Sequence, residues 1–281
     1  MTQSLCRLDD FKDNCGFGLI AQTKGKTSHK LLQNAIQALT CMTHRGGVAA
    51  DGKTGDGCGL LMQKPDSFLR TVFAEALGAE LPEAYAVGAV MLSTDAEQRS
   101  AAKDIINQEM SNQGLEILGW REVPTDSSCL GPIAIESLPA FEQVFVGPGD
   151  IADDKNFSAR LYMGRRKTEI RLEGDESFHI ASLGTNVLSY KGLMMPVDLP
   201  GFYLDLADER LETAICVFHQ RFSTNTMPRW PLAQPFRMLA HNGEINTIVG
   251  NRNWSVARTP KYKTELLPDI LEATPLVTVS Y

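Results

Sequence analysis

Apolar segments with the two-residue period of a strand are mixed irregularly with longer segments of helical period, and this mixture limits the folds open to the chain. Strand patterns occur at 16–21, 60–62, 86–92, 115–123, 144–146, 178–183, 187–190, 214–219 and 237–240. Helical patterns occur at 28–42, where Ser28 is a suitable N-cap, and at 95–112, 157–173 and 245–257. Strict strand–helix alternation is absent, which disfavours a doubly wound parallel sheet. The order favours an α+β fold, or a layered sheet-on-sheet arrangement with helices outside.

The composition is that of a globular protein and excludes several classes. The chain has 281 residues, of which 43% are hydrophobic and 22% charged, enough for a sizeable core. A net charge of −7 gives no broad attraction to nucleic acid or to an anionic membrane. No apolar run approaches the roughly 18 residues of a membrane span, and residues 1–14 lack the apolar stretch of a secretory signal. We therefore expect a cytoplasmic protein without a nucleic-acid or membrane partner.

The cysteines indicate neither a disulfide scaffold nor a metal site. None of the six forms a C-x-x-C pair, and no nearby histidine gives zinc-ligand spacing. Most are expected to be small buried hydrophobes. Cys15 differs, because it stands at the start of a strand pattern with the flexible Gly16 directly after it. Taken alone, Cys15 would still be interpreted as one more buried cysteine.

Four stretches concentrate reactive and anion-binding residue types, and together they reverse that interpretation. They are DNCGFGLIA from Asp13, HRGG from His44 with ADGKTGDGCGLL from Ala50, FHQRFSTNT from Phe218 followed by PRWPLAQPFR, and LAHNGEINT from Leu239. These motifs resemble the class II glutamine amidotransferases, a group of N-terminal nucleophile (Ntn) hydrolases, and in wording the glutamate synthase large subunits. The resemblance runs from about Asp13 to the end of the chain, and the individual motifs are long.

The resemblance implies a four-layer αββα sandwich with two antiparallel sheets. Residues 1–14 would be a propeptide and 15–281 the glutaminase domain, truncated before its C-terminal end. The last residues, from Pro275 to Tyr281, have a strand pattern where a domain usually ends in polar residues, so we expect a longer protein. Removal of residues 1–14 would expose the α-amine of Cys15. An α-amine with a pKa near 7.7–8.0 is a suitable base for a thiol nucleophile.

The same resemblance assigns the other site residues. Asn242, through its side-chain amide, and Gly243, through its backbone N–H, match the oxyanion-binding pair of the family. Without the other motifs, Asn242-Gly243 would be interpreted first as a hairpin turn. Arg221 matches the arginine that binds the glutamine α-carboxylate, with Thr224 and Asn225 in the same substrate pocket, and Arg45 matches one that helps to position the nucleophile. No cofactor or metal is expected in this segment.

In the resembled enzymes, a synthase region uses the released ammonia to aminate 2-oxoglutarate. The implied partners are therefore L-glutamine, that missing synthase region with FMN and an iron–sulfur cluster, and a small electron-donating subunit.

Two alternatives belong to other classes. Residues 47–54 fit the pattern G-x-x-x-x-G-K-[ST] of a phosphate-binding loop, which would indicate a P-loop nucleotide-binding protein. Such a loop must follow a strand and open a helix, whereas here a helical pattern precedes it and Gly55-Asp56-Gly57 follows it. The second alternative is a non-catalytic remnant of an amidotransferase, because the acidic residue that binds the substrate α-amine in the family would lie beyond Tyr281.

Overall fold

Two four-stranded antiparallel sheets form the framework of the computed structural model, which describes residues 16–220, 227–236 and 249–274. Sheet 1 has the order β1 (Phe17–Ala21), β8 (Ile215–Gln220), β2 (Cys58–Gln63), β7 (Val187–Gly192). Sheet 2 has the order β4 (Glu116–Glu122), β5 (Ala140–Gly147), β3 (Ala86–Leu92), β6 (His179–Gly184). Neighbouring strands in each sheet are antiparallel throughout. This excludes a doubly wound parallel sheet and confirms the α+β class.

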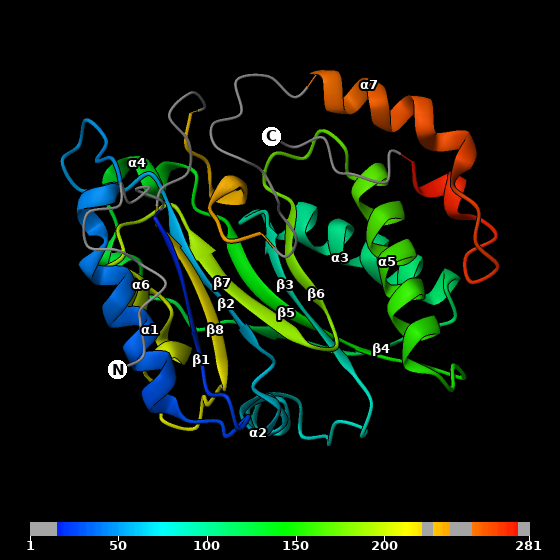
Figure 1. Cartoon of the computed structure of the whole chain (residues 1–281), viewed down its shortest axis with the longest axis horizontal. Helices are drawn as coiled ribbons and strands as arrows, with labels where there is room; N and C mark the ends of the chain where they lie inside the picture. Colours follow the sequence, from blue (N-terminus) through cyan, green and yellow to red (C-terminus); the bar gives the residue numbers. More distant parts are fainter. Residues whose placement is uncertain (1–15, 221–226, 237–248, 275–281) are drawn as a thin grey trace, which may run out of the picture.

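Helices cover the two sheets on opposite sides of the molecule (Figure 1). The longer ones are α1 (His29–Cys41) against β1 and β8, α2 (Asp66–Leu77), and α3 (Ala96–Asn112) and α5 (Asp154–Arg171) against sheet 2. The shorter ones are α4 (Pro132–Glu136), α6 (Leu199–Phe202) and α7 (Val249–Arg258). With two sheets between these helices, the arrangement fits the four-layer Ntn-hydrolase sandwich. No helix in the described ranges has both the length and the apolar character needed to cross a bilayer.

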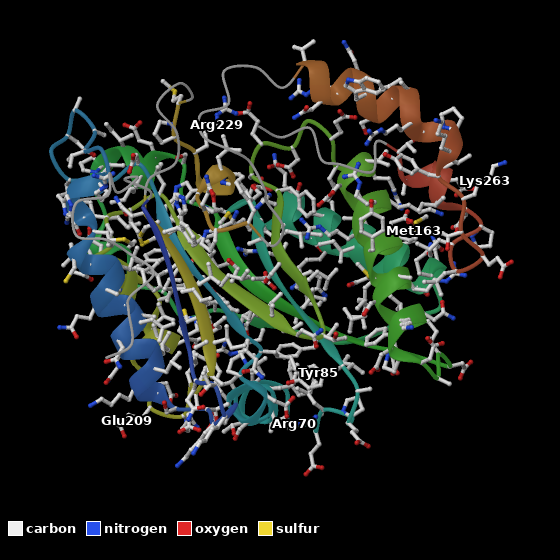
Figure 2. The ribbon with its side chains drawn as sticks, viewed as in Figure 1. Arg70, Tyr85, Met163, Glu209, Arg229 and Lys263 are labelled. Atoms are coloured by element: carbon white, nitrogen blue, oxygen red, sulfur yellow. The ribbon has the colours of Figure 1, made fainter. Side chains whose placement is uncertain are left out.

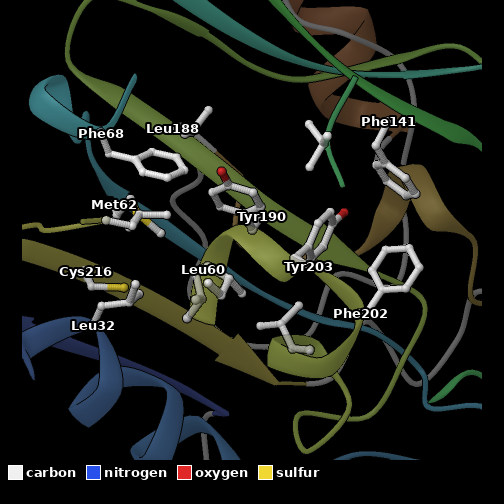
Figure 3. Packing of buried hydrophobic residues seen from close by; sticks show 14 of the residues in the cluster. Leu32, Leu60, Met62, Phe68, Phe141, Leu188, Tyr190, Phe202, Tyr203 and Cys216 are labelled. Atoms are coloured by element: carbon white, nitrogen blue, oxygen red, sulfur yellow. The ribbon is translucent and has the colours of Figure 1, made fainter. Parts of the chain in front are cut away.

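Two hydrophobic clusters hold the layers together. The larger one joins α1, sheet 1 and one face of sheet 2, and Figure 3 shows its centre around Leu60, Met62 and Tyr190. The smaller one fills the space between the opposite face of sheet 2 and helices α3 and α5. In β3, for example, Val87 belongs to the first cluster and Val90 to the second. A strand buried on both faces explains why its pattern is continuously apolar instead of alternating.

Most of the expected elements are present within a few residues of their expected bounds. Ser28 accepts a hydrogen bond from the backbone N–H of Leu31 at 3.3 Å, which confirms its capping role. α7 confirms the described part of the helix expected at 245–257, whereas the strand expected at 237–240 lies outside the described residues. The expected strand at 144–146 is too short, because β5 begins at Ala140. Its extra residues Glu142 and Gln143 look like a loop in sequence but are buried and bonded to Lys103 and Arg121.

Candidate active site

The strands of sheet 1 bring distant motifs together at one end of the sheet. The backbone N–H of Gln220 donates to the carbonyl oxygen of Gly16 at 2.5 Å. Cys58 lies opposite both Gln220 and Gly192 in the register of the sheet. We call these four residues, Gly16, Cys58, Gly192 and Gln220, the motif end of sheet 1. It combines the first, second and third of the sequence motifs.

Gly16 must be a glycine because of this pairing. A Cβ built on Gly16 would lie 2.2 Å from the carbonyl oxygen of Gln220, and a backbone atom in a sheet cannot easily move away. The flexible residue next to the expected nucleophile therefore has a steric reason in the sheet itself.

The second motif forms a hairpin-like loop that starts where α1 ends. Its backbone is closed by hydrogen bonds from Asp56 N–H to Gly47 O at 3.2 Å and from Ala49 N–H to Thr54 O at 2.8 Å. Gly52, at its tip, has a φ of 71°, in the left-handed region that favours glycine. We call residues 45–56 the arginine loop, because Arg45 begins it.

The arginine loop packs against the motif end through Gly46. A Cβ on Gly46 would lie 1.8 Å from Nε2 of Gln220 and 2.8 Å from Oδ1 of Asp56, so a larger residue would have to displace both side chains. Gln220 is 1% exposed, and its Oε1 has no hydrogen-bond partner among the described residues. Arg45, next to Gly46 in the sequence, is thus tied sterically to β8, whose last residue Gln220 directly precedes Arg221 in the sequence.

A cleft of about 1150 Å³ opens beside the arginine loop. Most of its wall comes from the arginine loop, from α4 with residues 137–139 after it, from the turn around Ser93 and from the segment 227–231, and Glu176, Ser177 and Leu193 also contribute to it. Arg45 and Arg229 both line it, and both are cations suited to a carboxylate. Figure 2 shows Arg229 at the opposite end of the molecule from Arg70 and Tyr85. The cleft is much larger than a free amino acid requires, and its lining is of mixed polarity.

The segment 227–236 forms one wall through Trp230. The indole is 2% exposed, and its Nε1 donates to the carbonyl oxygen of Ala134 in α4 at 3.1 Å. Its ring also packs edge-on against Phe141 at 5.5 Å between centroids. Trp230 is therefore a structural part of the wall. The ion pair of Arg229 with Glu176, at 3.3 Å, is exposed and contributes little.

The described cysteines near the site are poor nucleophiles. Burial raises the pKa of Cys58 well above its ordinary value, with the carboxylates of Asp198 and Asp56 adding to the effect. Burial also raises the pKa of Cys216 to about 12 and, with Asp198, raises the pKa of Cys129. Since the thiolate is the reactive form, these three thiols are unsuited to attack at neutral pH. Cys41 is exposed and does not line the cleft.

One carboxylate of the arginine loop shows the opposite shift. Asp51 accepts hydrogen bonds from the Thr54 hydroxyl and from three backbone N–H groups, those of Lys53, Thr54 and Ile133. These bonds, led by that of Thr54, hold the pKa of Asp51 far below its ordinary value. Asp51 is thus ionised at any physiological pH.

Of the residues assigned from sequence, the structure describes only Arg45, which it places in the cleft wall. Cys15, Arg221, Thr224, Asn225, Asn242 and Gly243 lie outside the described residues. The structure does describe the sequence neighbours of two of them. Gly16 directly follows Cys15, Gln220 directly precedes Arg221, and Gly16 and Gln220 are joined by a backbone hydrogen bond. Among the described residues, no group of three or more His, Cys, Asp or Glu side chains could hold a metal ion.

The context of a phosphate-binding loop is absent around residues 47–54. α1 and a 3-10 turn precede this stretch, and β2 follows it, so no strand enters the loop and no helix leaves it. Sequence reasoning missed Asp51 and Thr54 as structural residues. Their spacing, an Asp followed three residues later by a Thr, is a signal for local side-chain capping that could have identified them.

Comparison with known proteins agrees with this architecture. The model of the family described as glutamine amidotransferases class-II matches residues 15–280. The chain is 43% identical, over 255 residues, to the glutamate synthase [NADPH] large chain of Azospirillum brasilense, covering 89% of this chain and 17% of that protein. It is 41% identical over 268 residues to the same-named chain of Bacillus subtilis, covering 94% and 17%. A chloroplastic/mitochondrial ferredoxin-dependent glutamate synthase 1 of Arabidopsis thaliana is 40% identical over 254 residues, covering 89% and 16%.

The chain thus spans only about 17% of the length of the two bacterial relatives. The family match, by contrast, extends over nearly all of the chain and begins at Cys15. It agrees with the antiparallel two-sheet fold described above. The chain therefore belongs to the class II glutamine amidotransferases, a family of enzymes.

Proposed function

We propose that this chain is the glutaminase part of a glutamate synthase and hydrolyses L-glutamine to glutamate and ammonia. The observation that carries the proposal is the convergence at the motif end. Gly16 and Gln220, the residues next to Cys15 and Arg221, are hydrogen-bonded, and Gly46, next to Arg45, packs on the side chain of Gln220. The sequence neighbours of the expected nucleophile and of both arginines therefore meet at one end of sheet 1, beside a cleft.

In the proposed reaction, residues 1–14 are first removed, so that Cys15 becomes the N-terminal residue. Its thiol loses a proton to its own α-amine and attacks the side-chain amide carbon of glutamine. The tetrahedral oxyanion is bound by the Asn242 amide and the Gly243 backbone N–H. The protonated α-amine then gives its proton to the departing ammonia, which leaves a γ-glutamyl thioester on Cys15.

Hydrolysis of the thioester completes the cycle. The α-amine takes a proton from a water molecule, the resulting hydroxide attacks the thioester carbon, and glutamate leaves as the thiol is restored. Arg221 binds the α-carboxylate of the substrate, with Thr224 and Asn225 in the same pocket, and Arg45 helps to position Cys15. The raised pKa values of Cys58, Cys129 and Cys216 support this assignment, since they make these three thiols poor competitors for the role.

We further propose that the chain works as part of a longer cytoplasmic polypeptide. In it, the glutaminase domain starts at residue 15 and continues beyond Tyr281. The relatives carry the name glutamate synthase, with NADPH or ferredoxin in that name. A synthase region with FMN and an iron–sulfur cluster would use the ammonia to aminate 2-oxoglutarate, and a small electron-donating subunit would supply reducing equivalents.

Two measurements on the full-length protein test the mechanism. Intact-mass analysis is expected to find a mature terminus at Cys15, and a mature enzyme that starts at another residue would refute the base assignment. Replacement Cys15→Ala is expected to abolish glutamine hydrolysis while circular dichroism and the melting temperature stay unchanged. Cys41→Ala, which removes an exposed thiol outside the cleft, is the matched control and should keep full activity.

The alternatives give different results in the same experiments. A non-catalytic remnant would bind glutamine without releasing ammonia, in both the wild type and the Cys15→Ala variant. A nucleotide-binding protein would show a melting shift with ATP or GTP that disappears in Lys53→Ala.

A further inference from the structure

The stretch that imitates a phosphate-binding loop caps a helix of the cleft wall. The carboxylate of Asp51 accepts a hydrogen bond from the backbone N–H of Ile133 at 3.1 Å, and the hydroxyl of Thr54 accepts one from that of Ala134 at 3.2 Å. The same hydroxyl donates to Asp51 at 2.5 Å, which fixes its orientation. We call Asp51 and Thr54 with these contacts the clasp. The first N–H groups of α4 are thus satisfied from the arginine loop, about 80 residues away in the sequence.

The clasp is buried and closely packed against the residue before α4. Thr54 is 2% exposed, so it makes these bonds away from water. A Cβ on Gly131, which precedes α4, would lie 2.3 Å from the Thr54 hydroxyl and 2.6 Å from its backbone N. Lys53 adds a longer contact from its Nζ to the carbonyl oxygen of Ser128, at 3.4 Å. The residues that resemble a phosphate-binding motif therefore bind the start of α4 and the residues before it.

A second contact ties the middle of α4 to a different motif. The carbonyl oxygen of Ala134 accepts the indole N–H of Trp230, so one residue of α4 is bonded through its N–H to Thr54 and through its C=O to Trp230. α4 is therefore a brace between the arginine loop and the segment 227–236. Both of these line the cleft, as does Ile133 of the brace itself.

We propose that Asp51 and Thr54 are positioning residues for the glutamine site, acting through the arginine loop on Arg45. This inference rests on the proposed glutaminase function. The backbone hydrogen bonds of the loop transmit the restraint: Thr54 O accepts from Ala49 N–H, and Gly47 O accepts from Asp56 N–H. Loss of the clasp frees the loop from α4 and lets Arg45 move relative to the motif end. Displacements of about 1 Å at such residues can lower the rate by roughly a hundredfold.

The test uses Thr54→Val, which keeps the shape of the side chain but removes the hydroxyl, and Thr54→Ser, which restores it. Hydrogen exchange is measured over residues 43–49 and 131–136 in the full-length protein, together with kcat and KM for glutamine. Thr54→Val is expected to speed exchange in both segments about tenfold and to lower kcat/KM by at least about tenfold. Thr54→Ser is expected to return both to within about twofold of the wild type.

The control separates positioning from stability. Asp153 caps α5 by accepting the Asn156 N–H at 2.9 Å, and neither it nor its sequence neighbours line the cleft. Asp153→Ala removes this cap, and it should cost comparable stability and leave kcat/KM unchanged. Asp51→Asn, which keeps one acceptor oxygen, serves if Thr54→Val does not fold, and it is expected to give the same changes in smaller size.

Three results decide between the hypotheses. Unchanged exchange over residues 43–49 in Thr54→Val, or in Asp51→Asn if that variant is used, would overturn the clasp. Faster exchange with an unchanged kcat/KM would overturn the positioning role of Asp51 and Thr54. A wild type that releases no ammonia would refute the proposed function, and the exchange over residues 43–49 would still decide whether the clasp holds Arg45 in place.

Discussion

At the scale of single residues, the site depends on the close approach of two glycines to Gln220. Gly16 faces the backbone of Gln220, and Gly46 faces its side chain. Two different motifs therefore meet on one glutamine. The sequence predicts a flexible residue after Cys15, but the partner that requires it becomes visible only when β1 and β8 are paired.

The first prediction concerns Gly16→Ala. The added methyl group would lie 2.2 Å from the Gln220 carbonyl oxygen, so β1 must separate from β8 at the motif end. We expect loss of glutaminase activity and a clear fall in the melting temperature, measured by ammonia release and calorimetry.

Gly184→Ala is the matched control for Gly16→Ala. Gly184 also belongs to a strand, and a Cβ built on it meets no atom within 4 Å. This variant should retain activity and stability. Equal effects at both positions would show that the close approach to Gln220 is not the cause.

At the scale of elements, hydrophobic periodicity predicted most helices and strands well but their polar ends poorly. The strand at Ala86–Leu92 and the helix after Asp95 are confirmed almost to the residue. α2 was missed, although Phe68, Leu69, Val72 and Phe73 recur at helical spacing and Gly78 ends the helix with a φ of 66°. It has no side-chain N-cap bond, because Pro65 stands at its N-cap, and the usual start signal is therefore absent.

The second prediction concerns His179, the first residue of β6. Burial, with repulsion from Lys191 and Arg165, holds the pKa of His179 well below its ordinary value of 6.5. The folded protein keeps the ring neutral, whereas the unfolded chain binds a proton below about pH 6.5. The contribution of the neutral His179 ring to the free energy of unfolding is therefore fully present above about pH 6.5. It is lost as the pH falls, at up to about 1.4 kcal/mol per pH unit.

Urea unfolding of the wild type and of His179→Gln between pH 5 and pH 7.5 measures this effect. The wild type should lose more stability toward acid than the variant does. Parallel curves for the two proteins would show that folding does not lower the pKa of His179.

At the scale of the whole molecule, a buried polar network connects the two sheets. Arg121 of β4 makes two hydrogen bonds to Asp205, at 2.7 and 2.9 Å, and one to Gln143 of β5, at 2.9 Å. Tyr190 of β7, in sheet 1, donates its hydroxyl to Asp205 at 2.8 Å and accepts from Gln143 at 3.2 Å. All four side chains are buried, so each depends on the others for its hydrogen bonds.

The third prediction concerns Asp205→Asn. It leaves the guanidinium of Arg121 buried without its counter-ion, and removal of one partner of such a pair costs about 3–5 kcal/mol. Chemical denaturation should find that loss in the free energy of unfolding. The matched control is Asp208→Asn, in the partly exposed pair with Arg210, which should cost about 1 kcal/mol or less. Similar losses at both positions would contradict a special role for the buried network.

The sequence alone determined the secondary structure of most segments, the α+β class and, through its motifs, the resemblance to an amidotransferase. These features can be predicted from short stretches of consecutive residues, because a period of two or 3.6 residues does not depend on residues far away in the chain. Only the tertiary structure decided that Gly16, Gly46 and Gln220 meet, that Asp51 and Thr54 cap α4, and that Arg121, Gln143, Tyr190 and Asp205 share one network. Each of these depends on strand register and layer packing between residues far apart in the chain. The hydrophobic effect drives that packing but is not directional. Steric fit and hydrogen bonding therefore decide which residues come into contact.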